Sequence, residues 1–453
     1  MFWTSFVVAS FLTAVMHFVK RQMSAAAPAP VDSVEDGEEK EKSAKSVNVT
    51  PEFVSFQRNY LAVYLLAMFV DWLKGPYVYV LYESYGIAKK DIAVLFMGGF
   101  GASMLAGTVA GAAADTLGRR KMVLVFAASY AVAGVTKLFP SFWILMVGRI
   151  LSGVATSLLF SVFEAWMVCE HTKRGFSDAL LSDTFSKATT GNGIVAVVAG
   201  LVASAIASQY GFVAPFVLAL LPLGILAAIV VSTWSENYGN ASLEVSASLS
   251  NGISTLRANP GILFLGMAQS LFEGGMYTFV FMWTPGLATK ENHDSLPYGL
   301  IFAVYMVCIM LGSSVFSISL LPNKPSFLPN LSVQSLPLYI HSLAAATMLG
   351  TAYLFHNKTL VYLMFCSFEV ACGIFFPTYG TLRSLHIPES SRSTIMNIFR
   401  IPLNAVVLIV LIGADSMGTS QVFFICSIMH AAAGVCYVIA SSFFTPQTTS
   451  TSK

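Results

Sequence analysis

The chain has 453 residues, of which 56% are hydrophobic and 11% charged, and its mean hydropathy is +0.71. A soluble globular fold is excluded, because such a fold would leave large apolar patches in water. The composition predicts an all-α polytopic membrane protein with room for about a dozen spans of roughly 20 residues each. The net charge of +2 says little about partners.

The N-terminal segment 1–19 is apolar and is followed by Lys20 and Arg21. A secretory signal peptide would carry its positive charges before the apolar run, so we expect an uncleaved transmembrane anchor with its N-terminus outside. An interfacial or cleaved segment is the alternative. The polar tract within 20–55 predicts a disordered cytoplasmic linker, because it cannot form a core. The sequon at Asn48 would then be cytoplasmic and stay unglycosylated.

Twelve further apolar runs follow in chain order. They lie at 60–82, 92–114, 121–139, 142–168, 186–208, 212–233, 260–284, 298–321, 336–355, 358–382, 393–413 and 420–443. A polar interruption at 235–259 separates six runs from six and predicts a central cytoplasmic loop. We therefore expect six-helix bundles over 56–234 and 260–444 and a cytoplasmic tail over 445–453. Two bundles suit alternating access, in which one rocks against the other.

The basic residues of the short loops predict the orientation of the chain. One side of the predicted membrane carries Arg119, Arg120, Lys121, Lys173, Arg174, Lys187, Arg257, Lys324, Arg383 and Arg392. The opposite side carries only Lys89, Lys90, Lys137, Lys290 and Lys358. Since cytoplasmic loops are enriched in Lys and Arg, the first group and the C-terminus are predicted to be cytoplasmic.

A short charged turn, Gly-Ala-Ala-Ala-Asp-Thr-Leu-Gly-Arg-Arg-Lys, occupies residues 111–121 between two apolar runs. Its charges must stay hydrated at a membrane boundary while the flanking runs are buried. The turn resembles the signature loop between helices two and three of the major facilitator superfamily, which implies a cytoplasmic gate. We assign to this gate Gly111, Asp115, Gly118, Arg119 and Arg120. Near the cytoplasmic end of the fourth predicted span, Glu164 is expected to act in gating or anchoring.

Charged residues also lie near the middle of predicted spans, where each costs at least ~2.5–3.5 kcal/mol and is therefore a functional candidate. They are Asp71, Lys74, Arg149, Glu273, Glu369 and Arg400. The three cations are predicted to supply positive potential for an anion, because the arginine fork suits an oxyanion. Asp71 and Lys74 share a helix face and could neutralise each other or share an ion.

A coupling proton could be carried by Glu273 or Glu369, because a carboxyl group in a low-dielectric cavity favours its protonated form. For any single charged residue, the alternative is an interhelical ion pair that locks the bundle or gates it. No pair of histidines has metal-ligand spacing, so no metal site is expected. The six cysteines are interpreted as packing residues.

Nearly the whole core resembles the molybdate-anion transporter family. The matching blocks are Asp71-Trp72-Leu73-Lys74-Gly75-Pro76-Tyr77, Gly148-Arg149, Phe163-Glu164-Ala165-Trp166, Glu236-Asn237-Tyr238, Leu271-Phe272-Glu273, Trp283-Thr284-Pro285, Ala371-Cys372-Gly373, Ile387-Pro388-Glu389 and Phe399-Arg400-Ile401-Pro402. The resemblance implies a twelve-helix facilitator fold that imports molybdate, a tetrahedral dianion. By pseudo-symmetry, Glu389 and Arg392 are predicted to pair as a second-half counterpart of the gate.

The chain contains no phosphate-binding loop, nucleophile elbow or zinc-protease motif, so neither an ATP-driven pump nor an enzyme is expected. We expect no cofactor and no nucleic-acid partner. The predicted protein is a monomeric secondary transporter in the plasma membrane, with an intracellular membrane as the alternative. Three alternative functions stay open. They are transport of another anion such as sulfate, transport of a small organic solute, and a role as a non-transporting sensor or scaffold.

Overall fold

The computed structural model describes residues 1–25, 50–239, 253–289, 291, 295–320, 331–413 and 417–444. Within these ranges the chain is built from α-helices joined by short connections, and no β-strand occurs. The predicted all-α fold is confirmed. The central part of the expected linker, 26–49, and most of the expected central loop, 240–252, lie outside the described residues.

The helices follow one another along the chain in two sets. The first set is α1 (Phe2–Ala25), α2 (Pro51–Lys74), η1 (Gly75–Tyr77), α3 (Val78–Ser84), α4 (Lys89–Leu117), α5 (Arg119–Thr136), α6 (Phe142–Leu159), α7 (Val162–Lys173), α8 (Asp178–Tyr210), α9 (Ala214–Leu218) and α10 (Leu220–Thr233). The second set is α12 (Pro260–Leu287), α13 (Tyr298–Ser319), α14 (Leu336–Tyr353), α15 (Lys358–His386), α16 (Glu389–Gly413) and α17 (Thr419–Phe443).

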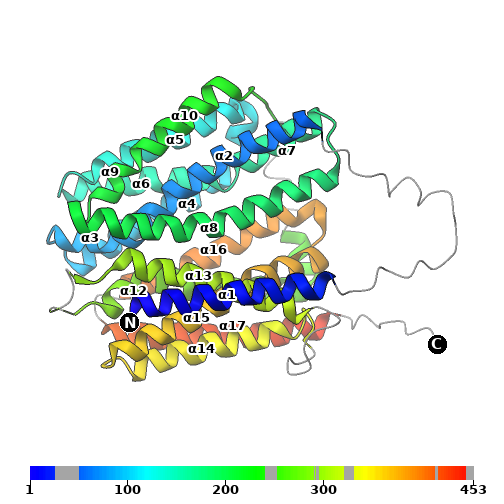
Figure 1. Cartoon of the computed structure of the whole chain (residues 1–453). Coiled ribbons are helices and arrows are strands. Elements are labelled where there is room, and N and C mark those ends of the chain that lie inside the picture. The colour runs from blue at the N-terminus through cyan, green and yellow to red at the C-terminus, as the bar shows by residue number, and fades with distance from the viewer. Residues whose placement is uncertain are drawn as a thin grey trace, which may run out of the picture.

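Two bundles form from these sets, and their helices run roughly parallel to one long direction (Figure 1). Helices α2 to α10 make one bundle, in which α2 packs on α8, α4 on α6 and α5 on α6. Helices α12 to α17 make the other, where α12 and α14 both pack on α17. Contacts of α8 with α13 and of α4 with α16 join the bundles, so any site between them is lined by both halves.

Three of the expected apolar runs are not single helices. The run 60–82 is interrupted by η1, a short 3₁₀ helix, because Pro76 has no backbone N–H to donate into a continuing α-helix. The run 142–168 breaks at Phe160 and Ser161, between α6 and α7, and the run 212–233 breaks at Ala219, between α9 and α10. Hydropathy alone does not report such breaks, since all three segments stay apolar.

Among the described residues, nine segments are long and apolar enough to cross a membrane. The N-terminal one, Phe2–Val19, has a mean hydropathy of 1.7, but its helix α1 continues to Ala25. Helix α1 lies along the second bundle, against α13 (Figure 1), and Phe2 packs edge-on against Tyr362 with ring centroids 5.0 Å apart. Phe11 and Phe18 are exposed, as expected for a face that meets lipid.

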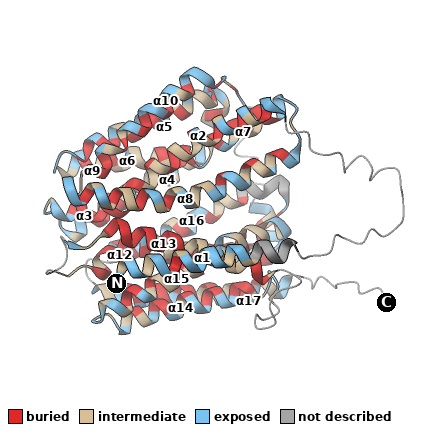
Figure 2. Ribbon diagram, in the orientation of Figure 1, coloured by how far each residue is buried: buried red, intermediate tan, exposed pale blue. Residues whose placement is uncertain are grey.

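Burial follows the bundle geometry, with buried residues between helices and exposed residues on their outward sides (Figure 2). The bundles meet closely where α8 crosses α13. A Cβ atom on Gly299 would lie only 2.3 Å from the backbone oxygen of Gly200, and the Gly299 amide donates to Tyr77 Oη at 3.3 Å. Phe96 and Phe281 add an edge-to-face contact at 5.1 Å. These contacts join the ends of the helices that are predicted to lie outside.

Candidate functional site

Arg149 lies on α6 and points toward α4. Its Nε donates to the backbone oxygen of Leu95 at 3.2 Å, and its guanidinium carbon lies 4.5 Å from the centre of the Phe96 ring. A Cβ atom on Gly99 would come within 2.7 Å of Arg149 Nη2, so glycine at that position makes room for the guanidinium. Arg149 is half-buried, and α4 holds it without neutralising its charge.

Asp71 and Lys74 are linked through Tyr130 of α5. The Tyr130 hydroxyl donates to Asp71 Oδ1 and lies 3.0 Å from Thr156 Oγ1 of α6. The Lys74 ammonium lies over the Tyr130 ring, 3.0 Å from its centre, which is a favourable cation–π contact. The two charged residues therefore share a helix face as expected, but the aromatic side chain contacts both of them.

Glu273 of α12 belongs to a second group of polar contacts, in the second half of the chain. Gln269 Nε2 donates to Glu273 Oε1 at 2.9 Å, while Arg383 Nη1 donates to Gln269 Oε1 at 3.1 Å. Arg383 and Arg400 both lie within electrostatic range of the Glu273 carboxylate. One amide side chain thus connects an acid on α12 with a base on α15.

Arg400 of α16 reaches toward the first half. A Cβ atom on Gly107 of α4 would lie 3.5 Å from Arg400 Nη1, so the guanidinium passes over a glycine. Tyr277 of α12 stands between the halves, with its ring 5.4 Å from that of Phe100 on α4. Tyr277 lies within electrostatic range of Asp71, Glu273 and Arg400. Charges from both bundles therefore converge on this tyrosine.

Glu369 is separate from this group. It lies on α15 and is 6% exposed. The groups that interact electrostatically with its carboxyl include the thiols of Cys366 on α15 and Cys308 on α13. Within the described part of the chain, no contact joins Glu369 to Glu273 or Arg400. The structure therefore brings together five of the six predicted mid-membrane charges and leaves the sixth in the core of the second bundle.

Interhelical ion pairing does not explain the central charges. In the described ranges the ion pairs are Arg119–Asp115, Arg174–Glu52, Arg174–Glu170 and Lys187–Asp183. All of them involve residues at the helix ends predicted to be cytoplasmic. The charges near Tyr130 and Tyr277 take part in none of these pairs and are held by aromatic rings, amides and backbone oxygens instead.

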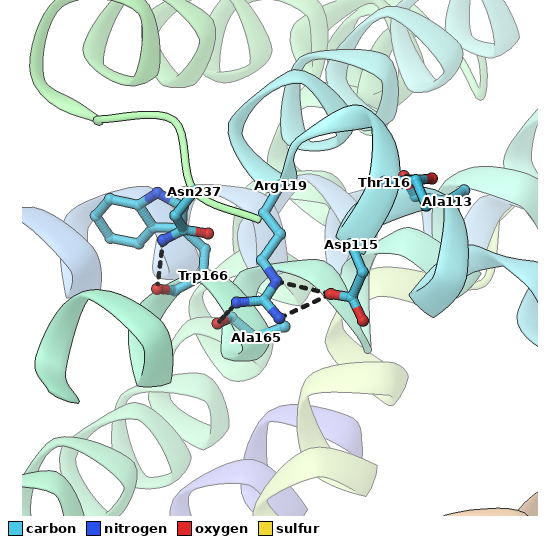
Figure 3. A network of polar contacts seen from close by, with 7 residues as sticks. All are labelled: Ala113, Asp115, Thr116, Arg119, Ala165, Trp166 and Asn237. Carbon is cyan, nitrogen blue, oxygen red and sulfur yellow. Dashed lines mark hydrogen bonds and ion pairs between the residues drawn. The ribbon is translucent and has the colours of Figure 1, made fainter. Parts of the chain in front are cut away.

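The predicted cytoplasmic turn forms a polar network (Figure 3). Arg119 donates to Asp115 Oδ1 from Nη2 at 2.7 Å and from Nε at 3.1 Å, and its Nη1 donates to the backbone oxygen of Ala165 at 3.1 Å. Gly118 has φ +105°, which side chains other than glycine rarely adopt. This geometry lets the pair span the break between α4 and α5 while it also contacts α7.

The segment after α10 completes this network and was missed as a site by the sequence prediction. Glu236 Oε1 accepts from the Arg120 amide at 2.8 Å. Asn237 Nδ2 donates to the backbone oxygen of Trp166 at 3.2 Å, and Figure 3 shows this second contact. Trp234 stacks on Trp166 with centroids 3.6 Å apart. The Glu236-Asn237-Tyr238 block carried the family resemblance, and that was the available signal.

Other residues assigned to gating are less connected. Gly111 is exposed, and a Cβ atom there would meet nothing within 4 Å. Glu164 is exposed in the first turn of α7, next to the Ala165 oxygen that Arg119 contacts. Glu389 and Arg392 belong to α16, but their side chains lie outside the described part of the structure, so their pairing stays a prediction.

A cavity of about 510 Å³ opens between the first turns of α2 and α8, away from the central charges. Gln57 of α2 donates to Asp183 Oδ2 at 2.8 Å, and Lys187 bonds both Asp183 and Gln57 there. These polar groups satisfy one another. The cavity is therefore a weaker candidate for an anion site than the central group.

Comparison with protein families gives one match over most of the chain. A family model described as sugar transporters with twelve transmembrane segments matches residues 32–352. The molybdate-anion transporter of Xenopus tropicalis is 35% identical over 398 residues, an alignment covering 86% of this chain and 86% of the relative. The molybdate-anion transporter of Takifugu rubripes is 33% identical over 428 residues, covering 86% of this chain and 88% of the relative.

Solved transporters share the fold. The POT family transporter PepTSo superposes with a TM-score of 0.68 at 10% identity, covering 86% of this chain and 98% of that one. A D-xylose–proton symporter gives a TM-score of 0.66 at 13% identity, with coverage of 86% and 98%. The nucleoside transporter NupG gives 0.67 at 9% identity, with coverage of 85% and 99%. At these identities the likeness concerns the fold alone.

Proposed function

The chain belongs to the molybdate-anion transporter family of the major facilitator superfamily, and from this premise we propose that it imports molybdate by alternating access. It is a multi-pass membrane transporter rather than an enzyme. The finer assignments are ours: molybdate as substrate, the plasma membrane as location and a monomer as the working unit. The name of the relatives and the charges of the central group support the substrate.

The observation that carries the proposal is that the central bases form no ion pair within the described residues. Among the described residues, neither Lys74 nor Arg149 forms an ion pair, although both lie in membrane-spanning bundles. Positive charge that is only partly compensated in such surroundings is costly and attracts an anion. Arg149 retains guanidinium donors that no described group engages, and its planar fork matches two oxygens of a tetrahedral oxyanion.

Arg400 offers a second positive charge from the opposite bundle. It lies against α4 at Gly107, on the same helix that Arg149 contacts at Gly99, so positive charge from both halves lies along α4 and can attract an anion between the bundles. A substrate held by both halves can stabilise one arrangement of the bundles over another, which alternating access requires. The close contact of α8 with α13 supports an arrangement that is closed at the outer end.

Uptake of labelled molybdate into cells tests this function, with Arg149→Ala compared against Arg257→Ala, which removes an exposed arginine outside the central group. The Arg149 change is expected to lower uptake at least about tenfold, since truncating one member of a buried charge pair costs ~2–5 kcal/mol. The Arg257 variant should match the unmodified protein. Equal uptake by both variants would remove Arg149 from the site.

Unmodified protein that reaches the membrane but carries no molybdate would contradict the substrate assignment. Uptake of labelled sulfate and of labelled neutral sugars then separates the alternatives. A sugar that is transported would favour the organic solute suggested by the family description. Absence of any solute flux would favour a sensor that has kept the transporter fold.

We propose Glu273, rather than Glu369, as the carrier of a coupling proton, because Glu273 lies in the central group and Glu369 does not. A proton bound to Glu273 changes the charge next to Arg383 and Arg400. Glu273→Gln is expected to abolish the stimulation of uptake by an inward proton gradient. Glu369→Gln is the matched control and should keep that stimulation. A retained gradient response in the Glu273 variant would exclude it as the carrier.

A further inference from the structure

Lys137 follows the last residue of α5 and was counted above as a charge in an outer loop. The structure buries it instead, with 3% of its surface exposed. Its Nζ donates to Tyr82 Oη at 2.6 Å and lies 5.0 Å from the centre of that ring, while its backbone oxygen accepts from Tyr85 Oη. Helix α3 and the turn after it therefore hold this lysine in one position.

The end of α5 next to Lys137 packs against α6 beside Arg149. Thr136, the neighbour of Lys137, lies directly against Gly148, the neighbour of Arg149: a Cβ atom on Gly148 would come within 1.9 Å of Thr136 Oγ1. Arg149 and Lys74 both act electrostatically on Lys137. Three basic side chains, from α2, from the residue after α5 and from α6, thus lie in one region of the first bundle.

Compensation for these charges is incomplete. Asp71, which accepts from Tyr130 beneath Lys74, is the carboxylate in this group, and Lys137 forms no ion pair within the described residues. A bound anion favours the charged form of nearby bases. With all three bases protonated, three positive charges less one negative charge leave an excess of two. Tyr82 occupies one of the three ammonium donors of Lys137, so donors remain for a ligand.

We propose that Lys137 completes a dianion site with Lys74 and Arg149 and makes the protein select divalent over monovalent tetrahedral oxyanions. The proposal rests on the oxyanion transport proposed above and deepens it. A dianion neutralises the excess charge of the group, whereas a monoanion leaves one positive charge uncompensated in surroundings where that is costly. Lys137 is a specificity-determining residue in this arrangement, and Arg149 supplies the directional fork.

Perrhenate is the matched probe, because it is tetrahedral like molybdate and carries one negative charge instead of two. Competition by unlabelled molybdate and by perrhenate against labelled molybdate gives a ratio of their half-inhibitory concentrations. In the unmodified protein perrhenate is expected to be the much weaker competitor. Lys137→Gln should reduce the preference for molybdate at least about tenfold, by loss of one buried charge contact.

Two further variants make the test specific. Lys137→Arg keeps the charge and should keep the preference. Lys358→Met removes a lysine in the second bundle whose Nζ likewise bonds one oxygen, of Gly286 at 2.9 Å, and lies over the Phe355 ring, and it should leave the ratio unchanged. Surface expression and elution as a single species show that each variant is folded.

An unchanged ratio in Lys137→Gln would overturn the proposal and leave Lys137 as a hydrogen-bonding partner of Tyr82. A ratio lost equally in Lys137→Gln and Lys137→Arg would also overturn it, since charge would then not be the determinant. Failure of the unmodified protein to carry molybdate is a different result. That outcome removes the oxyanion function itself, and this inference with it.

Discussion

Asp115 shows how one side chain can connect three helices. It lies in the last turn of α4, pairs with Arg119 at the start of α5, and through that arginine is linked to the Ala165 oxygen of α7. The two charged side chains are four residues apart, yet Gly118 with its positive φ turns the chain between them. The backbone oxygen of Asp115 also accepts from the Gly239 amide at 3.2 Å. The residue is therefore placed to hold together the helix ends predicted to be cytoplasmic in one state of the transporter.

Asp115→Asn is expected to slow transport at least about tenfold while changing the affinity for molybdate far less. The amide keeps the shape of the side chain but not its charge, and hydrogen bonds to charged groups contribute ~1.5–3 kcal/mol. Molybdate binding to purified protein, compared with initial uptake rates, measures the two effects separately. Loss of affinity equal to the loss of rate would indicate a role in binding instead.

Helices α8 and α13 form the tightest described contact between the bundles. Gly200 and Gly299 let the two backbones approach so closely that a Cβ atom on either would meet the oxygen of the other. Tyr77 adds a hydrogen bond to the Gly299 amide. Small residues at a helix crossing allow such an approach.

Gly299→Leu is expected to hinder closure at this crossing, since overpacking a tight contact costs ~1–3 kcal/mol. Initial uptake should fall about tenfold or more, because the outer ends could no longer meet. The control is Gly224→Leu, at an exposed glycine of α10 where a Cβ atom meets nothing within 4 Å. Normal uptake by the Gly299 variant would show that this contact need not close during transport.

The ends of the two bundles and of α1 can be compared with the predicted sidedness of the protein. In Figure 1 the N-terminus lies at the same end as α3, and the described end of α17 lies at the opposite end. Lys20 and Arg21 follow the apolar part of α1, as expected for a helix whose C-terminal end faces the cytoplasm. The networks around Asp115 and Asp183 lie at that same end of the first bundle.

An epitope tag at the N-terminus is therefore expected to be labelled on intact cells, and a tag at the C-terminus only after permeabilisation. Asn48 should stay unglycosylated, whereas a sequon added before Met1 should be modified. Gel mobility with and without glycosidase measures both sites. A glycan on Asn48 would show that the chain has the opposite orientation to the predicted one.

Hydropathy and the placement of charged residues were enough to predict the all-α fold, the order of the apolar segments and most of the central charges. These features are local: an apolar run of about 20 residues has one stable way to cross a bilayer, and a charge within it stands out. The breaks at Pro76 and Phe160 were not predicted, because they do not change the hydropathy of their runs.

Contacts between distant segments required the packed structure. The sequence predicts Lys137 to be a loop charge, whereas in the packed structure it lies beside Tyr82. The sequence assigns Glu369 and Glu273 the same role, whereas the structure places Glu369 away from the central group. Tyr277 carried no signal in the sequence, because its importance comes from helices that meet only after folding. A spacing along one helix predicts which residues share a face, but which faces meet depends on the packing of all the helices together.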